Sequence, residues 1–251
     1  MTGCETKTGG SPTGAPACTT FAFRCGPERA CFGACCRDVT IVLTPYDVVR
    51  LKNALHMDST DFLEQYTLRM RTAEQKFPLV LLKMQEEGKR CPLFAKQGCA
   101  VYDGRPWACR MYPLGTEPAE PGKPTHTILH EDFCLGHGQD APMTADEWMR
   151  QQGAEPFEMM GAGFQELTRH SFWKSGKLTE QQAAMFYMAC YDLDRFRRFV
   201  FETRFLKLLE VDEARTEALR TDDLELLDFG IQWLRFSIFG ERTMKVRRNG
   251  A

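Results

Sequence analysis

The chain has 251 residues, of which 43% are hydrophobic and 26% are charged, and its formal net charge at pH 7 is -2. This length allows one or two domains with a buried core, and the composition is that of an ordinary globular protein. The small net charge argues against nucleic acid or an anionic membrane surface as the partner. No apolar run approaches the ~20 residues that a membrane-spanning helix needs.

The N-terminal segment, Met1 to Thr20, is rich in Thr, Gly, Pro and Ser and has no apolar central region. This composition predicts a disordered tail and not a secretory signal. Without an export signal the expected compartment is the cytoplasm, where thiols stay reduced and disulfides rarely persist.

The first predicted elements follow this tail. Val39 to Leu43 is a β-branched run that favours a strand. Thr44 then predicts the N-cap of a helix, with Asp47 near its positive end. A second short helix is expected to start at Ser59 or Thr60, and the continuous apolar run from Phe77 to Met84 predicts a buried strand. A further strand is expected at residues 125–129.

The pattern becomes helical from Met143 onward. Two capping-box sequences predict helix starts, at Thr144 and at Thr179. The second of these helices is expected to run from Glu180 to about Leu209. A final helix is predicted over residues 222–239, with a glycine as its stop.

Cysteine is the unusual feature of the composition. Eleven cysteines are present, and eight of them fall in two groups within a single stretch: Cys25, Cys31, Cys35, Cys36, Cys91, Cys99, Cys109 and Cys134. Clustered cysteines in a reducing compartment more often bind metal or do redox chemistry than form disulfides. Eight sulfurs can supply one four-sulfur site with spare residues, or two complete sites. All eight are therefore candidate metal ligands.

The surrounding arginines fit this interpretation. Four thiolates around a divalent ion or an oxidised [4Fe-4S] core leave a net charge of about -2. Arginines near the cysteines can neutralise that charge and donate hydrogen bonds to sulfur. The candidates for this supporting role are Arg37, Arg105 and Arg110, with Arg24 and Arg90 also close in sequence.

The cysteines have two other interpretations. Buried cysteines can be inert, because a free thiol packs as a small hydrophobe. Disulfides are the second alternative, and the vicinal pair Cys35 and Cys36 is hard to bridge. The remaining three cysteines are not expected to bind metal. Cys190 falls on an apolar helical stripe and is expected in the core, and Cys4 and Cys18 lie in the tail.

The ordered series of motifs resembles the YkgJ-type cysteine-cluster family. The quoted motifs are Phe23-x-Cys25, Cys31-x-Gly33-x-Cys35-Cys36-Arg37, Leu43-Thr44-x-x-Asp47, Cys91-Pro92-Leu93, Cys99-x-Val101-Tyr102 and Arg105-Pro106-x-x-Cys109-Arg110-x-Tyr112-Pro113. The resemblance covers roughly Phe23 to Cys134. The family is described as a zinc- or iron-chelating domain, so the resemblance implies metal binding without implying a reaction. One departure is that five residues separate Cys25 from Cys31, where the family typically has two.

Catalytic alternatives find little support in the residues. A related member of the family is a flagellin lysine methylase. A nucleotide-binding fold would place a glycine-rich loop directly after a strand, but Gly161-Ala162-Gly163 sits in a predicted helix. A radical S-adenosylmethionine site would need a third cysteine where Asp38 stands. No His-Glu-x-x-His motif indicates hydrolytic zinc chemistry. His137 could chelate from its place three residues after Cys134, although a surface position is the simpler expectation.

The sequence therefore predicts an α+β fold: an irregular, metal-stapled cysteine-cluster domain with short strands and helices, followed by a mainly helical region. The expected domains are a tail (1–20), the cysteine-cluster domain (21–142) and a helical region packed on it (143–251). The leading hypothesis is an iron–sulfur protein, with a 4Fe-4S cluster and a redox or accessory role. The alternatives are a zinc-stapled interaction scaffold and a cluster-dependent enzyme such as a protein lysine methyltransferase. The expected partners are the metal and a protein bound through the helical region, with neither nucleic acid nor membrane.

Overall fold

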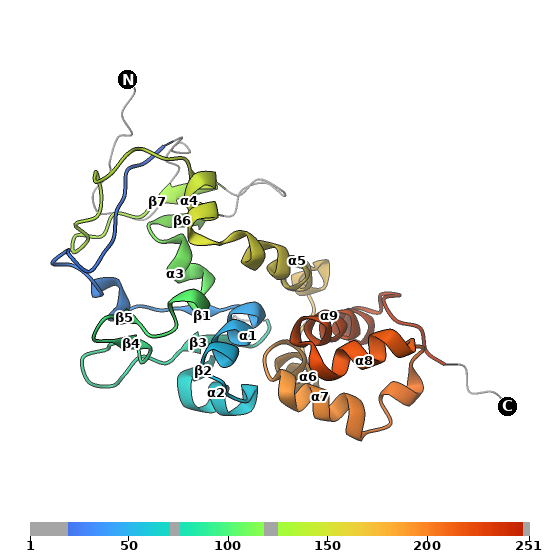
Figure 1. Cartoon of the computed structure of the whole chain (residues 1–251). Coiled ribbons are helices and arrows are strands. Elements are labelled where there is room, and N and C mark those ends of the chain that lie inside the picture. The colour runs from blue at the N-terminus through green and yellow to red at the C-terminus, as the bar shows by residue number, and fades with distance from the viewer. Residues whose placement is uncertain (1–19, 71–75, 118–124, 248–251) are drawn as a thin grey trace. The chain divides into compact units, whose positions relative to one another are not determined.

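The computed structural model describes residues 20–70, 76–117 and 125–247. The chain divides into two compact units (Figure 1). Unit 1 comprises Met1–Val39, Met84–Tyr102 and Trp107–Pro156, and unit 2 comprises Thr40–Lys83, Asp103–Pro106 and Phe157–Ala251. The predicted tail, with Cys4 and Cys18, lies outside the described residues apart from Thr20. The domain boundaries expected at residues 20 and 142 stay predictions.

Unit 1 is built from short elements joined by irregular chain. They are the 3-10 turn η1 (Ala34–Cys36), the hairpin of β4 (Phe94–Ala95) and β5 (Gly98–Cys99), helix α3 (Trp107–Met111), the ribbon of β6 (Leu114–Glu117) and β7 (Thr125–Ile128), and helix α4 (Ala145–Gln152). The strand predicted at residues 125–129 is thus present as β7, paired antiparallel with β6.

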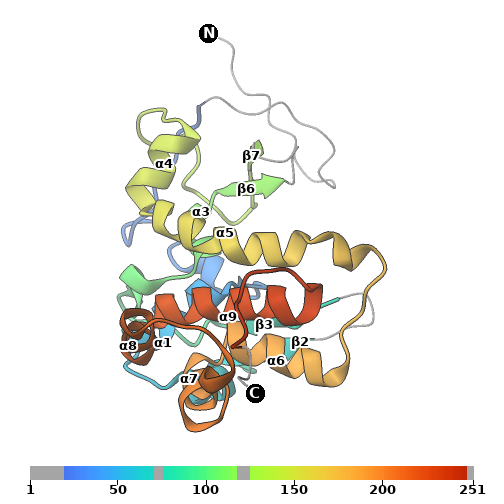
Figure 2. The same ribbon diagram turned by 90° about the vertical axis from the view of Figure 1, so that its right-hand side faces the viewer.

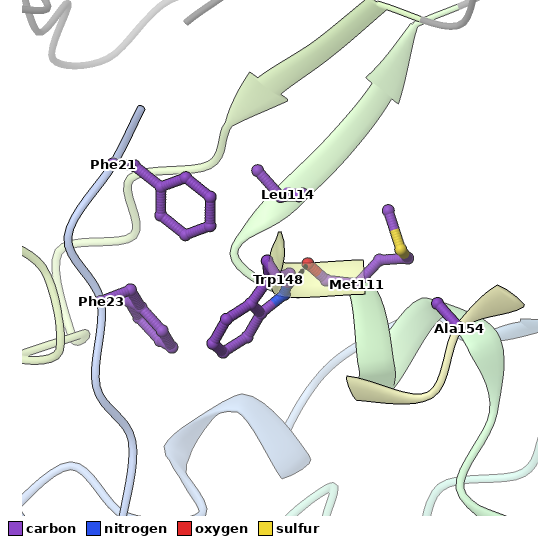
Figure 3. Close-up of a cluster of buried hydrophobic side chains, with 6 residues drawn as sticks. All are labelled: Phe21, Phe23, Met111, Leu114, Trp148 and Ala154. Atoms are coloured by element: carbon purple, nitrogen blue, oxygen red, sulfur yellow. Dashed lines mark hydrogen bonds between the residues drawn. The ribbon is translucent and has the colours of Figure 1, made fainter. Parts of the chain in front are cut away.

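An aromatic core holds unit 1 together. Its buried members are Phe21, Phe23, Met111, Leu114, Trp148 and Ala154 (Figure 3). Trp148 packs edge-on against Phe21 and Phe23, with ring centroids 5.9 and 5.5 Å apart. Its Nε1 also donates to the Met111 carbonyl at 3.2 Å, drawn as a dashed line in Figure 3. Burying each such side chain contributes about 1.5–3 kcal/mol, so this core ties the N-terminal segment to α3 and α4.

Unit 2 contains a three-stranded antiparallel sheet and most of the helices. The strand order is β1 (Val42–Leu43), β3 (Leu79–Leu82) and β2 (Thr67–Met70), so β3 is central. The other elements are α1 (Pro45–Ala54), α2 (Ser59–Tyr66), α5 (Glu155–Arg169), η3 (Ser171–Lys174), α6 (Glu180–Cys190), α7 (Leu193–Glu202), η4 (Leu206–Leu208), α8 (Glu213–Thr221) and α9 (Asp223–Phe239). The apolar run predicted as a buried strand is β3, in which Val80 and Leu82 are buried.

Helix α9 is the centre of the helical packing. It contacts α1, α6, α7 and α8 (Figure 2). A Cβ on Gly230 would lie 2.7 Å from the Ala189 carbonyl oxygen, so this glycine lets α9 approach α6 closely. The predicted bounds of this helix are confirmed: Asp222 caps its first turn, and Gly240 ends it with a φ of 72°.

The capping predictions are also confirmed. Thr44 and Asp47 form a reciprocal capping box at α1, and Thr144 with Glu147 does the same at α4. The helix after Thr179 starts as predicted, but the expectation of one helix to about Leu209 is wrong.

The chain breaks between α6 and α7 because Asp192 forms tertiary hydrogen bonds. Its buried carboxylate accepts from the hydroxyls of Ser59 (3.0 Å) and Thr60 (2.8 Å) at the start of α2. An aspartate has low helix propensity, and these bonds hold it in a non-helical conformation with φ -97° and ψ 65°. The helical spacing of apolar residues, from which one long helix was predicted, carries no information about these partners. They lie more than a hundred residues away in the sequence.

The α+β prediction with a helical C-terminal region is confirmed. Within the described ranges, no helix is both long enough and apolar enough to cross a membrane.

Candidate metal centre

All eight predicted ligand cysteines lie in unit 1. They come from four places: the Cys25 to Cys36 segment, the Cys91 to Cys99 segment, α3 and the segment before Gly136. None of the nine cysteines in the described part of the chain forms a disulfide. Cys190, in α6 of unit 2, is completely buried, which confirms the prediction that it is a core residue.

Gly33 shapes the first cysteine segment. It has a φ of 78° and precedes η1, which carries Cys35 and Cys36. A Cβ at this position would lie 2.2 Å from Cζ of Phe94, so a side chain has no room. The packing is reciprocal, because the ring of Phe32 lies against Gly98, at 3.1 Å from where its Cβ would be. These contacts join the two cysteine-bearing segments.

Backbone hydrogen bonds place the second segment alongside the first. The Cys91 amide donates to the Cys36 carbonyl at 2.8 Å, and the Asp38 amide donates to the Lys89 carbonyl at 2.8 Å. Arg37 and Arg90 form an antiparallel bridge between these bonds. Cys36 and Cys91 are therefore held as neighbours although 54 residues separate them in the sequence.

The Cys91-Pro92-Leu93-Phe94 turn presents amide donors to a sulfur. Burial raises the pKa of Cys91, while hydrogen bonds from the amides of Leu93 and Phe94 lower it. Such N–H···S bonds favour the thiolate, which is the form that binds metals. The hairpin that follows pairs Phe94 with Cys99, which brings a further sulfur near Cys91.

The closing segment brings Cys134 to the first segment. The Arg24 amide donates to the Gly136 carbonyl at 3.0 Å, and the Gly138 amide donates to the Ala22 carbonyl at 2.9 Å. The Leu135 amide donates directly to Sγ of Cys31 at 3.3 Å. Cys134 itself packs against the aromatic core.

The sulfurs gather into two neighbourhoods. Burial and, to a smaller extent, the nearby sulfurs of Cys35, Cys31 and Cys134 raise the pKa of Cys25 to about 11, against the opposing effect of Arg29. We call these four cysteines the Cys25 neighbourhood. The other four form the Cys36 neighbourhood, since Cys36 interacts with Cys91 and Cys109, and Cys91 interacts with Cys99. Cys35 also interacts with Cys91, so it borders both neighbourhoods.

The two neighbourhoods meet at the vicinal pair. The Cys36 thiol donates a hydrogen bond to the Cys35 sulfur, which lowers the pKa of Cys35 to about 7 and raises that of Cys36. One member of the pair is thus readily a thiolate while the other holds its proton. A bound cation would favour the thiolate form of both, because it removes the repulsion between neighbouring negative sulfurs.

The donor set fits zinc or an iron–sulfur cluster, since both prefer soft thiolate ligands. Among residues 20–70, 76–117 and 125–247, no three His, Cys, Asp or Glu side chains are already arranged to hold a metal ion. The sulfurs are gathered in neighbourhoods and not at coordination distances. Metal binding would therefore require the loops to close locally around it.

The predicted supporting arginines have different settings. Arg37 is exposed beside the vicinal pair, whereas Arg105 is buried in unit 2. Arg110 is buried, and its Nη1 donates to the Gln152 carbonyl at 2.7 Å, near the C-terminal end of α4. At least this nitrogen serves a helix end, where a cation is favourable. The role of all three toward the metal stays a prediction.

Two residues of the Cys25 neighbourhood were not predicted from the sequence. Arg29 interacts with Cys25, and Tyr112 lies beside Cys134 and Cys35. The signal for Arg29 was its place in the loop between two cysteines. Tyr112 belongs to the last of the cysteine motifs, but its proximity to Cys134 depends on the tertiary fold.

His137 is not the surface residue expected. It is partly buried, with its ring centroid 5.2 Å from Phe23 and 4.3 Å from His130. Burial, with a smaller effect of His130, lowers its pKa.

Comparison with known families is consistent with this geometry. Residues 24–134 match the family model CxxCxxCC, described as "Putative zinc- or iron-chelating domain". Searches of curated proteins and of solved structures gave no match. The matched segment spans all eight cysteines that unit 1 gathers, so the expected resemblance to the cysteine-cluster family is confirmed.

Proposed function

We propose that this chain, in which residues 24–134 match the CxxCxxCC family model, is an iron–sulfur protein that binds a 4Fe-4S cluster through cysteine thiolates. The observation that carries the proposal is the convergence of eight thiols from four places in the chain into two adjoining neighbourhoods. Thiols that only fill space in a core need not converge. Cys190 is an example, since it is fully buried in α6.

The ligands follow from the two neighbourhoods. Cys25, Cys31, Cys35 and Cys134 would form one four-sulfur set, and Cys36, Cys91, Cys99 and Cys109 the other. Each set has the number of thiolates that a 4Fe-4S cluster or a structural zinc site takes. Arg37 and Arg110, which lie in the same unit as the sulfurs, would offset the negative charge of the filled sites.

A bound iron–sulfur cluster supplies one-electron chemistry, so the role we propose is redox or accessory to a redox enzyme. A thiol-rich centre of this kind suits the reducing cytoplasm. The helices of unit 2 would provide a surface for a protein partner.

Zinc is the second candidate, because the same eight thiols satisfy it. A closed four-sulfur zinc site is structural, and the function would then be that of a stapled interaction scaffold. Methyl transfer gains no support from Gly161 and Gly163, since both lie inside α5 and form no phosphate-binding loop.

The deciding experiment is the iron, zinc and acid-labile sulfide content of the full chain purified without oxygen, together with its absorption spectrum. Iron with equimolar sulfide and a broad band near ~400 nm is the expected result for a cluster. Zinc without sulfide or colour would replace the iron–sulfur proposal by the scaffold. A chain without bound metal would overturn both.

A further inference from the structure

Four buried side-chain atoms of unit 1 have no hydrogen-bond partner of normal geometry among the described residues: Nδ1 of His126, Nε2 of His137, Nε of Arg29 and the hydroxyl of Tyr112. The last two always carry a proton to donate at neutral pH. An unsatisfied buried donor costs about 1–3 kcal/mol, so each needs a physical explanation. Both lie at the Cys25 neighbourhood, where Arg29 interacts with Cys25 and Tyr112 with Cys134 and Cys35.

Packing fixes the ring of Tyr112, and its hydroxyl interacts with the Cys134 side chain. The ring meets Phe23 edge-to-face, with centroids 5.8 Å apart. Tyr112 and Cys134 both pack against the aromatic core (Figure 3 shows the buried members of this core). The core therefore holds the hydroxyl beside the Cys134 sulfur, where a thiolate would accept its proton in a hydrogen bond.

The closing segment holds the guanidinium of Arg29. Its Nη1 donates to the Leu135 carbonyl at 3.2 Å, and the amide of the same Leu135 donates to Sγ of Cys31 at 3.3 Å. Arg24, one residue before Cys25, behaves differently: its side chain is 60% exposed and pairs with Glu28. Arg29 is thus held through Nη1, while its buried Nε has no partner and its charge acts on Cys25.

We propose that Arg29 and Tyr112 donate hydrogen bonds to the thiolate sulfurs of the Cys25 neighbourhood when the metal is bound, Arg29 to Cys25 and Tyr112 to Cys134. The two residues would thereby set the charge and the reduction potential of this neighbourhood and leave the Cys36 neighbourhood unaffected. This inference rests on the proposed function. Hydrogen bonds to cluster sulfurs raise the potential, because they stabilise the more negative, reduced form.

The test compares Tyr112→Phe and Arg29→Gln with wild type, using the full chain purified without oxygen. The matched controls are Tyr191→Phe, which removes another buried hydroxyl without a partner but in unit 2, and Arg24→Gln. Iron, sulfide and a redox titration followed by electron paramagnetic resonance are measured. We expect wild-type iron and sulfide in Tyr112→Phe and Arg29→Gln, a shift of one signal to lower potential, and no shift in the controls.

Arg29→Lys provides a second variant in case Arg29→Gln loses metal. Lysine retains a positive donor, so its potential should lie nearer to that of wild type. Potentials of Tyr112→Phe and Arg29→Lys equal to that of Tyr191→Phe, at full cluster content, would overturn the inference while leaving the proposed function intact. A wild-type chain without metal would instead remove the proposed function, and the inference with it.

Zinc-loaded protein allows the same inference to be tested without redox chemistry. Hydrogen bonds to a zinc thiolate make it less nucleophilic, so an alkylating reagent should release zinc several-fold faster from Tyr112→Phe than from Tyr191→Phe. Equal release rates would contradict the proposed bonds.

Discussion

The ring of Phe94 occupies the space that a side chain on Gly33 would need, with Cζ 2.2 Å from the position of a Cβ. Gly33 also has a φ of 78°, a conformation that L side chains rarely adopt. This contact lets the turn carrying Cys35 and Cys36 lie against the turn carrying Cys91. A glycine and an aromatic ring therefore decide whether the two cysteine-bearing segments can meet.

Gly33→Ala should lower both stability and metal content. The left-handed conformation costs about 1–2 kcal/mol for a residue with a Cβ, and the clash with Phe94 adds to it. Gly88→Ala is the matched control, because Gly88 has a φ of 69° in the same unit but nothing within 4 Å of its Cβ position. Urea unfolding and metal analysis of the two variants measure the difference.

The double variant Gly33→Ala/Phe94→Leu tests the cause. A smaller side chain at residue 94 relieves the clash and should recover part of the loss, whereas the backbone strain remains. Equal losses in Gly33→Ala and Gly88→Ala would show that the contact with Phe94 is unimportant.

Single cysteine variants should divide by neighbourhood. Cys134→Ser is expected to remove the metal of one set, Cys109→Ser that of the other, and the double variant nearly all of it. Cys35→Ser should also lower the metal content. Cys190→Ser should not, because Cys190 is buried in α6 and no other described cysteine belongs to unit 2. Metal per chain, measured on folded protein, gives the answer. Unchanged content in both Cys134→Ser and Cys109→Ser would contradict the ligand assignment.

Removal of the metal should strongly destabilise unit 1. The sulfurs are gathered from distant segments, and binding free energy at such a site is also folding free energy. We expect a strong chelator to lower the melting temperature, and reconstitution to restore it. A melting temperature unchanged by both treatments would mean that the cysteines do not bind a structural metal.

Acid should weaken unit 2 through Asp194. Burial alone would raise the pKa of this carboxyl, but hydrogen bonds from the Ser59 amide and Lys52 lower it below its ordinary 3.8. The folded pKa is thus below the unfolded one, so the stabilisation is present above about pH 4 and is lost as the pH falls through the folded pKa. Unfolding free energies at neutral and acid pH measure this loss.

Asp194→Asn should remove that part of the acid sensitivity and lower stability at pH 7. The exposed Glu202 on the same helix supplies the control, Glu202→Gln, for which we expect wild-type behaviour. If Asp194→Asn keeps the full pH dependence, other carboxyl groups are responsible.

Trp148→Ala should cost about 3–5 kcal/mol, the usual effect of emptying a large aromatic site. Trp148→Phe should cost less, since it keeps a ring but loses the bond to the Met111 carbonyl. Because the aromatic core holds the segment before Cys25, we expect Trp148→Ala also to weaken metal binding. Calorimetry and metal analysis check both expectations.

Local signals in the sequence determined much of the secondary structure. The capping boxes at Thr44, Thr144 and Thr179 depend only on residues three apart, so their helices begin where predicted. The end of α9 at Gly240 is equally local. The break at Asp192 was missed because its partners, Ser59 and Thr60, are far away in the sequence.

The sequence alone also determined the chemistry of the candidate site, since eight cysteines with turn-forming glycines favour a thiolate metal centre whatever their arrangement. Only the tertiary structure decided which sulfurs are neighbours, because pairing Cys36 with Cys91 and Cys31 with Leu135 depends on backbone bonds between distant segments. The same holds for Arg29 and Tyr112. Their proposed role depends on burial, which removes water and leaves the nearby sulfurs as acceptors.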